Sequence, residues 1–464
     1  MAPLVTIILA AGKGTRMKSD LVKVLHPLLG VPMLSYPVDL SVTKLKAQKT
    51  IVVVGYQADR IKERFKGEPI EFVLQEEQLG TGHAVLQAIP LLQGFEGTVL
   101  ILCGDVPLVR ASTLRGFIES FERDEAVLSV LTTFVEDPSG YGRIIRDDKG
   151  LLQRIVEEKD ATKEERTIRE INTGLYCVQA PFLREGLQGI GRENAQGEYY
   201  LTDLIEIARG KGFSCSAFRA EDSLEVMGIN TRVDLATAHE RLRQEKVREL
   251  MLSGVTVLDP STAYIDRGVT VGKDTVLHPN CTLQGKTVIG ERCVIESGVK
   301  ISDSILGDEV TIRPHCVITE SRLEDGVVIG PFAHLRPLTE VRSKAKIGNF
   351  VEVKKSVIGR GTKANHLTYL GDAVIGEKVN IGAGTITCNY DGFKKHQTII
   401  GDRVFVGSNV EIVAPVKVGN DSSIGAGSTI TRDVPEGALA ISRVKQKTIP
   451  GWSEKQKRRR EKED

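Results

Sequence analysis

The stretch Val5–Met17 reads Val-Thr-Ile-Ile-Leu-Ala-Ala-Gly-Lys-Gly-Thr-Arg-Met and decides the fold of the first half of the chain. The β-branched apolar run at its start predicts a buried parallel strand. The glycine-rich turn that follows lets backbone N–H groups approach an anion closely, and the arginine adds a fixed positive charge. We therefore expect a loop that holds a triphosphate, although a plain tight turn explains the glycines equally well.

Spacing excludes two familiar phosphate loops. A Walker loop needs four residues between its first Gly and Gly-Lys-Ser/Thr, and Gly12-Lys13-Gly14-Thr15 lacks that frame. The dinucleotide fingerprint needs a third small residue where Met17 stands.

Composition indicates an ordinary globular protein. The length of 464 residues predicts two or three domains, and the net charge of +1 gives no argument for nucleic acid or membrane as a partner. The seven Cys form no Cys-x-x-Cys pair, which favours a reducing compartment. No segment approaches the roughly 20 apolar residues of a membrane span, and the apolar run Leu4–Ala11 lacks the basic flank of a signal peptide. We expect a cytoplasmic protein.

Strand-like and helix-like segments alternate through the first half. The strand-like runs are Thr50–Val54, Ile70–Leu74, Thr98–Leu102, Val127–Phe134, Leu175–Val178 and Ser214–Phe218. The helix-like segments are Ala58–Lys66, His83–Leu92, Ala111–Glu125 and Thr202–Gly212. This alternation predicts an α/β domain with a mostly parallel sheet and helices on both faces. Ligands of such sheets bind beyond the carboxyl ends of the strands. The glycine loop, Gln75 and Asp105 should therefore lie at one edge.

Asp105 follows an apolar strand in the sequence Val-Leu-Ile-Leu-Cys-Gly-Asp-Val-Pro. A single acid at a strand tip is a common way to present a carboxylate to a hard cation. An aspartate that caps the next turn is an equally good interpretation.

A helix without Pro or Gly is predicted over Asp234–Leu252, and it ends at Ser253-Gly254. Its many charges favour a semi-rigid linker, although a helix packed on the first sheet is an alternative. The predicted division is a first domain at 1–232, a helical linker at 233–253 and a second domain at 254–464.

Aliphatic residues recur at every sixth position in the second half. They are Val271, Leu277, Leu283, Ile289, Ile295, Ile301, then after a frame shift Leu306, Ile312 and Ile318, and later Ile400, Val406, Ile412, Val418, Ile424 and Ile430. A six-residue period predicts a β-helix in which each flat face uses one hexapeptide. The aliphatic residue should point inward, and the Gly that often follows it should help the chain to turn.

The repeat stops between Ile386 and Ile399, where a loop must leave the prism. Loops on rigid scaffolds often carry function. The prism could still serve only for oligomerisation, and the repeat alone does not decide between a catalytic domain and a scaffold.

Several motifs together resemble a known family. In the first half they are Leu-Ala-Ala-Gly-Lys-Gly-Thr-Arg-Met, Lys-Val-Leu-His, Leu-Gly-Thr-Gly-His, Gly-Asp-Val-Pro-Leu, Gly-Tyr-Gly-Arg-Ile, Glu-Ile-Asn-Thr-Gly and Asn-Ala-Gln-Gly-Glu-Tyr-Tyr-Leu-Thr-Asp. In the second half they are His-Leu-Thr-Tyr-Leu-Gly-Asp, Asn-Ile-Gly-Ala-Gly-Thr and Cys-Asn-Tyr-Asp-Gly. The chain resembles, over nearly its whole length, the bacterial enzymes that combine N-acetylglucosamine-1-phosphate uridylyltransferase and glucosamine-1-phosphate acetyltransferase activities.

For the first half, the resemblance implies a Rossmann-like nucleotidyltransferase domain that transfers a uridylyl group from UTP to N-acetylglucosamine-1-phosphate and releases pyrophosphate. Asp105 and Asn230 would hold Mg²⁺, and Gly12, Gly14, Arg16 and Lys23 would hold phosphates. Gln75, Gly80 and Thr81 would contact uracil. Gly142, Glu157 and Asn172 would hold the sugar. The implied site for UTP and UDP-N-acetylglucosamine also includes Leu9, Ala10 and Ala11.

For the second half, the resemblance implies a left-handed β-helix that transfers acetyl from acetyl-CoA to glucosamine-1-phosphate. His366 lies inside the matched motif and would be the general base, since imidazole titrates near neutral pH. Arg336, Lys354, Tyr369 and Asn380 would bind the sugar phosphate. Acetyl-CoA would contact Ala383, Asn389, Tyr390, Ser408, Ala426 and Arg443.

The family also implies a homotrimer, with no nucleic-acid partner, that supplies a precursor of peptidoglycan and lipopolysaccharide. Two alternatives stay open: a nucleotidyltransferase whose β-helix is only a scaffold, and a non-catalytic subunit with degenerate sites. The loop at 387–398 and His366 argue against the first, and Lys23, Asp105 and Asn230 argue against the second.

The chain departs from the family at two positions. Cys103 stands where many relatives have Tyr, and Val22 stands where Pro usually precedes the lysine. The basic run Lys455–Arg460 near the end is expected to be solvated, with contact to a coenzyme phosphate or an acidic surface as the alternative.

Overall fold

The structure is a computed structural model that describes residues 3–463. Residue contacts divide the chain into two compact units, Met1–Arg243 and Gln244–Asp464. Within the described residues, no helix combines the length and apolar character needed to cross a membrane. The domain boundaries at residues 232 and 253 stay predictions, because the division by contacts falls inside a helix.

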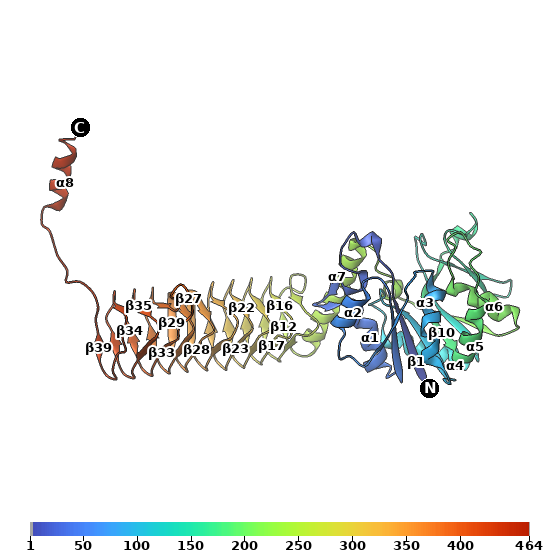
Figure 1. Cartoon of the computed structure of the whole chain (residues 1–464), viewed down its shortest axis with the longest axis horizontal. Coiled ribbons are helices and arrows are strands. Elements are labelled where there is room, and N and C mark those ends of the chain that lie inside the picture. Colours follow the sequence, from blue (N-terminus) through green and yellow to red (C-terminus); the bar gives the residue numbers. More distant parts are fainter. Residues whose placement is uncertain (1–2, 464) are drawn as a thin grey trace. The chain divides into compact units, whose positions relative to one another are not determined.

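A nine-stranded sheet forms the centre of the first unit (Figure 1). Its main path is β11-β7-β10-β6-β1-β4-β5, and β10 alone on this path runs antiparallel to its neighbours. The strands on the path are β1 (Leu4–Ala10), β4 (Lys49–Val54), β5 (Glu71–Leu74), β6 (Thr98–Cys103), β7 (Leu128–Phe134), β10 (Glu170–Gln179) and β11 (Cys215–Arg219). The hairpin of β8 (Arg143–Arg146) and β9 (Leu152–Val156) attaches to β10, and β2 (Pro27–Leu28) pairs with β3 (Val31–Pro32).

Helices cover both faces of this sheet, as the alternation predicts. Successive residues of a strand point to opposite faces, so Ile7 and Ile8 belong to two different apolar clusters. The cluster around Ile7 includes residues of α3 (Thr81–Ala88), α5 (Ala180–Gly186) and α6 (Leu204–Gly210). The cluster around Ile8 includes residues of α2 (Ala58–Arg64) and α4 (Ala111–Arg123). A short α1 (Ser35–Asp39) lies between β3 and β4 in the chain. The predicted α/β class is confirmed.

The predicted helix after the first domain is α7 (Arg232–Leu252). Ala238, with Leu235 and Leu242 beside it, packs in an apolar cluster of the first unit. Val247 and Leu250 belong to the core of the second unit. Each end of α7 therefore has an apolar anchor, which a freely exposed linker would not have.

The second unit is a parallel β-helix of short strands, here a left-handed one (Figure 1). One sheet comprises β14 (Thr270–Val271), β17 (Val288–Ile289), β20 (Ile305–Leu306), β23 (Ser321–Leu323), β26 (Thr339–Val341), β28 (Val357–Ile358), β30 (Ala373–Ile375), β33 (Thr398–Ile400) and β36 (Val416–Val418). The larger sheet comprises β12 (Thr256–Val257), β13 (Tyr264–Ile265), β15 (Val276–Leu277), β16 (Thr282–Gln284), β18 (Val294–Ile295), β19 (Lys300–Ser302), β21 (Thr311–Ile312), β22 (Val317–Thr319), β24 (Val328–Ile329), β25 (His334–Leu335), β27 (Lys346–Lys354), β29 (Lys363–Gly371), β31 (Asn380–Ile381), β32 (Ile386–Cys388), β34 (Phe405–Val406), β35 (Glu411–Val413), β37 (Ser423–Ile424), β38 (Thr429–Ile430) and β39 (Leu439–Ala440).

The register between coils reproduces the six-residue repeat. Ile295 pairs with Ile312 and Val406 pairs with Ile424, so like positions stack from coil to coil. The aliphatic positions of the repeat are buried, apart from the partly buried Val271. The final helix, α8 (Trp452–Arg460), has no buried residue.

The expected role of the repeat glycines is wrong. Most of them, such as Gly272 and Gly382, have no left-handed φ, and the left-handed corner positions are held instead by residues such as Arg292 and Glu309. A Cβ on Gly382 would lie 2.5 Å from the carbonyl oxygen of Gly407 in the next coil. These glycines are therefore required by the close approach of neighbouring coils and not by the turn.

Gly272→Ala should destabilise the second unit by about 1–3 kcal/mol, because its Cβ would lie 2.6 Å from the carbonyl oxygen of Gly290. Urea denaturation followed by circular dichroism measures this loss. Gly427→Asn is the matched control, since its site is open and asparagine tolerates its left-handed φ of 71°. Equal stability of Gly272→Ala and the wild type would contradict the close-approach explanation.

Candidate functional site

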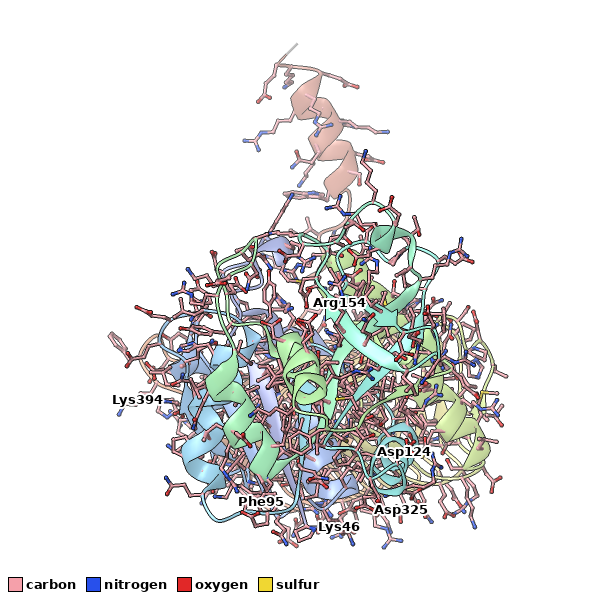
Figure 2. The ribbon with its side chains drawn as sticks, turned by 90° about the vertical axis from the view of Figure 1, so that its right-hand side faces the viewer. Lys46, Phe95, Asp124, Arg154, Asp325 and Lys394 are labelled. Carbon is pink, nitrogen blue, oxygen red and sulfur yellow. The ribbon has the colours of Figure 1, made fainter. Side chains whose placement is uncertain are left out.

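The first group of predicted site residues lies at the carboxyl edge of the sheet in the first unit. Backbone hydrogen bonds join Gly104 to Leu9 and Gln75 to Val54, so the segments after β1, β4, β5 and β6 leave the sheet side by side. Figure 2 shows Lys46, Phe95 and Asp124, which precede β4, β6 and β7, together on one side of this unit, with Arg154 on the other side. The parallel arrangement thus gathers the predicted residues at one edge, as expected.

Gly14 in the loop after β1 is required by geometry. Its φ is 65°, and a Cβ there would lie 2.5 Å from the Cβ of Lys23. The plain-turn interpretation therefore explains this glycine fully, and the case for a phosphate site depends on the charges around the loop.

Three cationic and polar segments converge beside that loop. The Lys23 ammonium forms an ion pair with Asp105 and donates to Oδ1 of Asn230 at 3.2 Å. The Arg16 guanidinium donates to the same Asn230 oxygen at 2.9 Å. Residues more than 200 positions apart in the chain thus share one cluster. It places two positive charges next to the side-chain oxygens of Asp105 and Asn230.

The start of α7 holds Asn230 in position. The Asp234 carboxylate accepts the backbone N–H groups of Asn230 at 2.9 Å and of Thr231 at 2.8 Å. The Thr231 hydroxyl accepts the N–H of Asp234 in return, at 3.2 Å. Sequence reasoning did not single out this capping box, although the Thr-x-x-Asp spacing before a helix is its usual signature.

The pair Asp105 and Asn230 fits a divalent cation. Carboxylate and amide oxygens are hard metal ligands. Mg²⁺ typically binds one or two protein oxygens, while substrate phosphates and water supply its other ligands. The Lys23 ammonium already lies against both oxygens, which shows that this position attracts positive charge. Among residues 3–463, no cluster of three or more His, Cys, Asp or Glu residues suggests another metal site.

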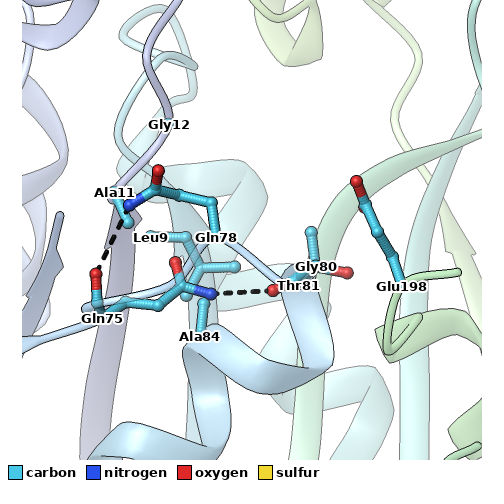
Figure 3. Close-up of a pocket in the computed structure, with 9 residues that line it drawn as sticks. All are labelled: Leu9, Ala11, Gly12, Gln75, Gln78, Gly80, Thr81, Ala84 and Glu198. Carbon is cyan, nitrogen blue, oxygen red and sulfur yellow. Dashed lines mark hydrogen bonds between the residues drawn. The ribbon is translucent and has the colours of Figure 1, made fainter. Parts of the chain in front are cut away.

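A cavity of about 220 Å³ opens between the glycine loop and α3 (Figure 3). It is lined by Leu9, Ala11, Gly12, Gln75, Gln78, Gly80, Thr81, Ala84 and Glu198. Gln78 was missed in the sequence, and Glu198 lies in the motif Gly-Glu-Tyr-Tyr but received no role there, because only the fold brings both to the cavity. Ala10 is buried in β1 and does not line it.

Gly142, Glu157 and Asn172 also lie together. The Asn172 N–H donates to the carbonyl of Gly142 at 2.9 Å. A Cβ on Gly142 would lie 3.4 Å from a carboxylate oxygen of Glu157 and 3.5 Å from the Cβ of Asn172. The turn before β8, the end of β9 and strand β10 thus meet around one small, acidic space.

Glu157 is an acid that ionises at unusually high pH. Burial is the main cause, and repulsion by Asp160, Asp203 and Glu198 adds to it, so the pKa of Glu157 rises to about 7. Burial also raises the pKa of Asp203 to about 6. At neutral pH this part of the site therefore holds fewer negative charges than its sequence suggests.

Cys103 carries an unreactive thiol. Its thiol lies 3.5 Å from the carbonyl of Gly174, and burial raises the pKa of Cys103 to about 12. The thiol is therefore neutral at neutral pH and fills space beneath the Lys23–Asp105 cluster.

The second group of predicted residues lies on the β-helix around His366. Strands β27 and β29 pair so that Asn349 stands opposite His366, and Asn349 Oδ1 lies 2.8 Å from Nδ1 of the ring. An amide oxygen accepts hydrogen bonds, so Nδ1 carries the proton. The Nε2 lone pair of this exposed ring is left to accept a proton, as a general base requires.

A basic cluster lies nearby on the β-helix. The Lys395 ammonium is the main cause that lowers the pKa of Lys354, and Arg336 adds to the effect. Arg336 forms a 2.8 Å ion pair with Glu352, which stands opposite Tyr369 in the register. Lys395 comes from the loop that interrupts the repeat, and no local pattern marked it in the sequence.

Asn389 joins that loop to the prism. Its side-chain amide donates to Asp372 at 2.6 Å and lies 3.4 Å from the Tyr369 hydroxyl. Asn389 is 7 % exposed, so its side chain anchors the loop. The neighbouring Tyr390 is exposed and closes the loop through a 2.6 Å hydrogen bond to Gly392. Asn380 pairs with Lys363 on the adjacent coil of the prism.

Ala383, Ser408 and Ala426 form a column. They follow Gly382, Gly407 and Gly425, which are stacked in successive coils. Arg443 donates to the carbonyl of Ala426 at 2.6 Å and thus lies at the end of the column. The register brings together all four residues, although the loop separates Ala383 from Ser408 by 25 positions.

Family comparisons match both units. The family described as Nucleotidyl transferase matches residues 5–224, and the family described as Bacterial transferase hexapeptide (six repeats) matches residues 397–432. The GMPPB C-terminal domain matches residues 264–339.

Similar proteins match the chain from end to end. "Bifunctional protein GlmU" of Pelobacter propionicus is 54% identical over 99% of this chain and 100% of its own length. The protein of the same name from Geobacter metallireducens is 55% identical over 98% of this chain and 100% of its own. That from Listeria monocytogenes is 49% identical over 98% of both chains.

Glu157→Gln should change how stability depends on pH. An acid whose pKa is raised from 4.5 to about 7 on folding binds more protons folded than unfolded between those values. It therefore lowers the free energy of unfolding as pH rises from 5 to 8. The glutamine variant should lose about 1–3 kcal/mol less than the wild type over this interval, as measured by urea denaturation at both pH values.

Glu158→Gln is the matched control, because the pKa of Glu158 is lowered and that of Glu157 is raised. Burial opposes the effect, but the hydrogen bond from Arg143 lowers the pKa of Glu158. Between pH 5 and pH 8 this variant should lose as much free energy of unfolding as the wild type. The same loss in Glu157→Gln and the wild type would contradict the raised pKa.

Proposed function

The chain belongs to the bifunctional GlmU family, and on this premise we propose how its residues make UDP-N-acetylglucosamine in two steps. The β-helix transfers acetyl from acetyl-CoA to glucosamine-1-phosphate. The α/β unit then transfers a uridylyl group from UTP to N-acetylglucosamine-1-phosphate and releases pyrophosphate. The product supplies peptidoglycan and lipopolysaccharide synthesis.

In acetyl transfer, His366 acts as general base. The amine of glucosamine-1-phosphate must lose a proton to become a nucleophile, and Nε2 of His366 accepts it because Asn349 fixes the proton of the ring on Nδ1. The amine nitrogen forms a bond to the acetyl carbon, the carbon–sulfur bond breaks, and the leaving thiolate takes up a proton. This His366–Asn349 pair is the observation that carries the proposal for the second unit.

The sugar phosphate binds to the basic cluster of Arg336, Lys354 and Lys395, with Tyr369 and Asn380 as further contacts. Charge-assisted hydrogen bonds from such a cluster suit a phosphate dianion. Acetyl-CoA lies along the column of Ala383, Ser408 and Ala426, whose small side chains leave room for an extended ligand, with Arg443 at the end of the column. Asn389 and Tyr390, from the loop at 387–398, would be further contacts of acetyl-CoA.

Uridylyl transfer depends on positioning and charge. The phosphate oxygen of N-acetylglucosamine-1-phosphate attacks the α-phosphorus of UTP, and this reaction needs no protein nucleophile. Lys23 and Arg16 hold the phosphates, with the backbone of Gly12 and Gly14. Asp105 and Asn230 would hold Mg²⁺, which would offset the negative charge that develops on the phosphates.

The two ends of the nucleotide sugar bind on either side of this cluster. Uracil enters the cavity lined by Gln75, Gly80 and Thr81, next to Leu9 and Ala11. Ala10 contributes only through the buried end of β1. The N-acetylated sugar binds among Gly142, Glu157 and Asn172.

We also propose that the chain works as a cytoplasmic homotrimer assembled through the β-helix. A ladder of rings supports an assembly surface. His315 stacks on Phe332 with centroids 5.2 Å apart, and Phe332 stacks on Phe350 at 5.4 Å. Phe332 and Phe350 are about half exposed in the single chain, so a second copy of the chain would cover apolar surface there.

A scaffold-only β-helix is the weaker alternative. It requires neither an imidazole ordered by an amide on the prism surface nor a loop that brings Lys395 to Lys354.

Substitutions in each site should separate the two activities. His366→Ala should lower acetyl transfer at least about 100-fold and leave UTP-dependent release of pyrophosphate unchanged, because only the general base is lost. Release of CoA thiol from acetyl-CoA and glucosamine-1-phosphate measures the first activity. Loss of both activities in a folded His366→Ala variant would contradict the assignment.

Asp105→Ala should have the reverse effect. Pyrophosphate release should fall at least about 100-fold, and release of CoA thiol should stay at the wild-type rate. Removal of divalent cations with a chelator should likewise stop only the uridylyl reaction, and Mg²⁺ should restore it in the wild type. Equal activity with and without the metal would overturn the assignment of Asp105 and Asn230.

A further inference from the structure

The amide of Gln75 is held in one orientation by its neighbours. Gln75 is 3 % exposed, and its Nε2 lies 3.1 Å from the carbonyl oxygen of Gly80 (Figure 3). The same nitrogen lies 3.2 Å from Nδ1 of His83. A carbonyl oxygen only accepts, so the amide must direct its NH₂ group toward Gly80. The opposite orientation would place two oxygens face to face.

The same argument decides the tautomer of His83. Because the Gln75 NH₂ group faces Nδ1, this nitrogen must accept, and a neutral ring then carries its proton on Nε2. The Nε2 atom of Gln87 lies 3.1 Å from this ring nitrogen and donates to the backbone carbonyl of His83 at 3.2 Å. A neutral ring accepts at one nitrogen only, and the buried Gln75 amide takes that acceptor, while the partly exposed Gln87 keeps its bond to the backbone carbonyl.

His83 is itself fixed by packing. It lies on α3, and its ring stacks on Tyr199 with centroids 6.1 Å apart and planes 27° apart. The Arg192 guanidinium covers the Tyr199 ring at 5.4 Å. A ring fixed by this stacking is a firm partner for Gln75.

Both N–H bonds of the Gln75 amide are thus used, and its oxygen is left for a ligand. Gln75 lines the 220 Å³ cavity, and Figure 3 shows its amide oxygen turned away from Gly80, toward the space beside Leu9 and Gln78. No hydrogen bond to this oxygen occurs within residues 3–463. The cavity therefore presents a fixed acceptor, with no donor from the same amide.

We propose that His83 is a positioning residue that makes the nucleotide site selective for uracil over cytosine. It does so by fixing the Gln75 amide with the oxygen toward the base. N3 of uracil carries a proton and donates to that oxygen. N3 of cytosine has a lone pair, which would face the oxygen without a proton between them. This inference rests on the proposed uridylyl transfer.

The expected size of the effect follows from one hydrogen bond. A buried polar group facing the wrong partner should change the rate at least about tenfold, which corresponds to about 1.4 kcal/mol or more. Without an acceptor at Nδ1, the Gln75 amide loses one of its two anchors and can turn to present its NH₂ group. The preference for UTP over CTP should then fall.

The test compares kcat/KM with UTP and with CTP in the full-length protein, by release of pyrophosphate with N-acetylglucosamine-1-phosphate. His83→Leu should lower the ratio of the two values at least about tenfold. His83→Asn should restore most of the ratio, because the Asn oxygen stands where Nδ1 stood. Gln87→Leu is the matched control on the same helix and should change the ratio by less than about threefold, since the contact between Nδ1 and Gln75 remains.

Three results would overturn the proposal. The first is His83→Leu with equal losses for both nucleotides and an unchanged ratio. The second is His83→Asn with the same ratio as His83→Leu, and the third is Gln87→Leu with as large a change as His83→Leu. A wild type that releases no pyrophosphate from UTP would instead overturn the proposed function, and this inference with it.

Discussion

Parallel backbone pairing is the constraint on which both units depend. In the first unit, parallel strands end at the same edge of the sheet, so the segments after β1, β5 and β6 leave together. In the second unit, parallel pairing repeats like positions in successive coils. In both units, strand pairing alone makes neighbours of residues that lie far apart in the chain.

The two sites differ in charge in a way that suits their substrates. Lys23 and Arg16 meet Asp105 and Asn230, so this cluster balances two cations against the oxygens that we propose as metal ligands. The β-helix site gathers Arg336, Lys354 and Lys395, and repulsion lowers the pKa of Lys354. A phosphate dianion relieves that repulsion on binding. The acidic pocket at Glu157, which is partly protonated at neutral pH, suits the uncharged sugar hydroxyls and amide.

The sequence predicted the architecture well, because both folds have periodic signatures. The alternation of strands and helices and the six-residue repeat each correspond to one element of structure, and both predictions are confirmed. The role of the repeat glycines was misjudged, because the approach of the next coil is a property of stacking and has no local signature. Gly14 was likewise assigned to phosphate binding, but its left-handed conformation and the proximity of Lys23 already require a glycine there.

Supporting residues were harder to predict than the residues they support. Asp234 orients Asn230, Asn349 orients His366 and His83 orients Gln75, each through a hydrogen bond formed by the fold. Lys395 reaches Lys354 only because the loop folds back on the prism. Motifs mark residues that would meet a substrate, and among the side chains that act through such residues only Asp234 has a local signature, the Thr-x-x-Asp spacing before a helix.

The central claim is that one chain carries two complete and separate sites. It is tested most directly by mixing purified His366→Ala and Asp105→Ala proteins with glucosamine-1-phosphate, acetyl-CoA, UTP and Mg²⁺. Each protein alone should make no UDP-N-acetylglucosamine, and the mixture should make it, because the acetylated intermediate can pass from one protein to the other. A mixture of folded variants that makes no product would contradict the account.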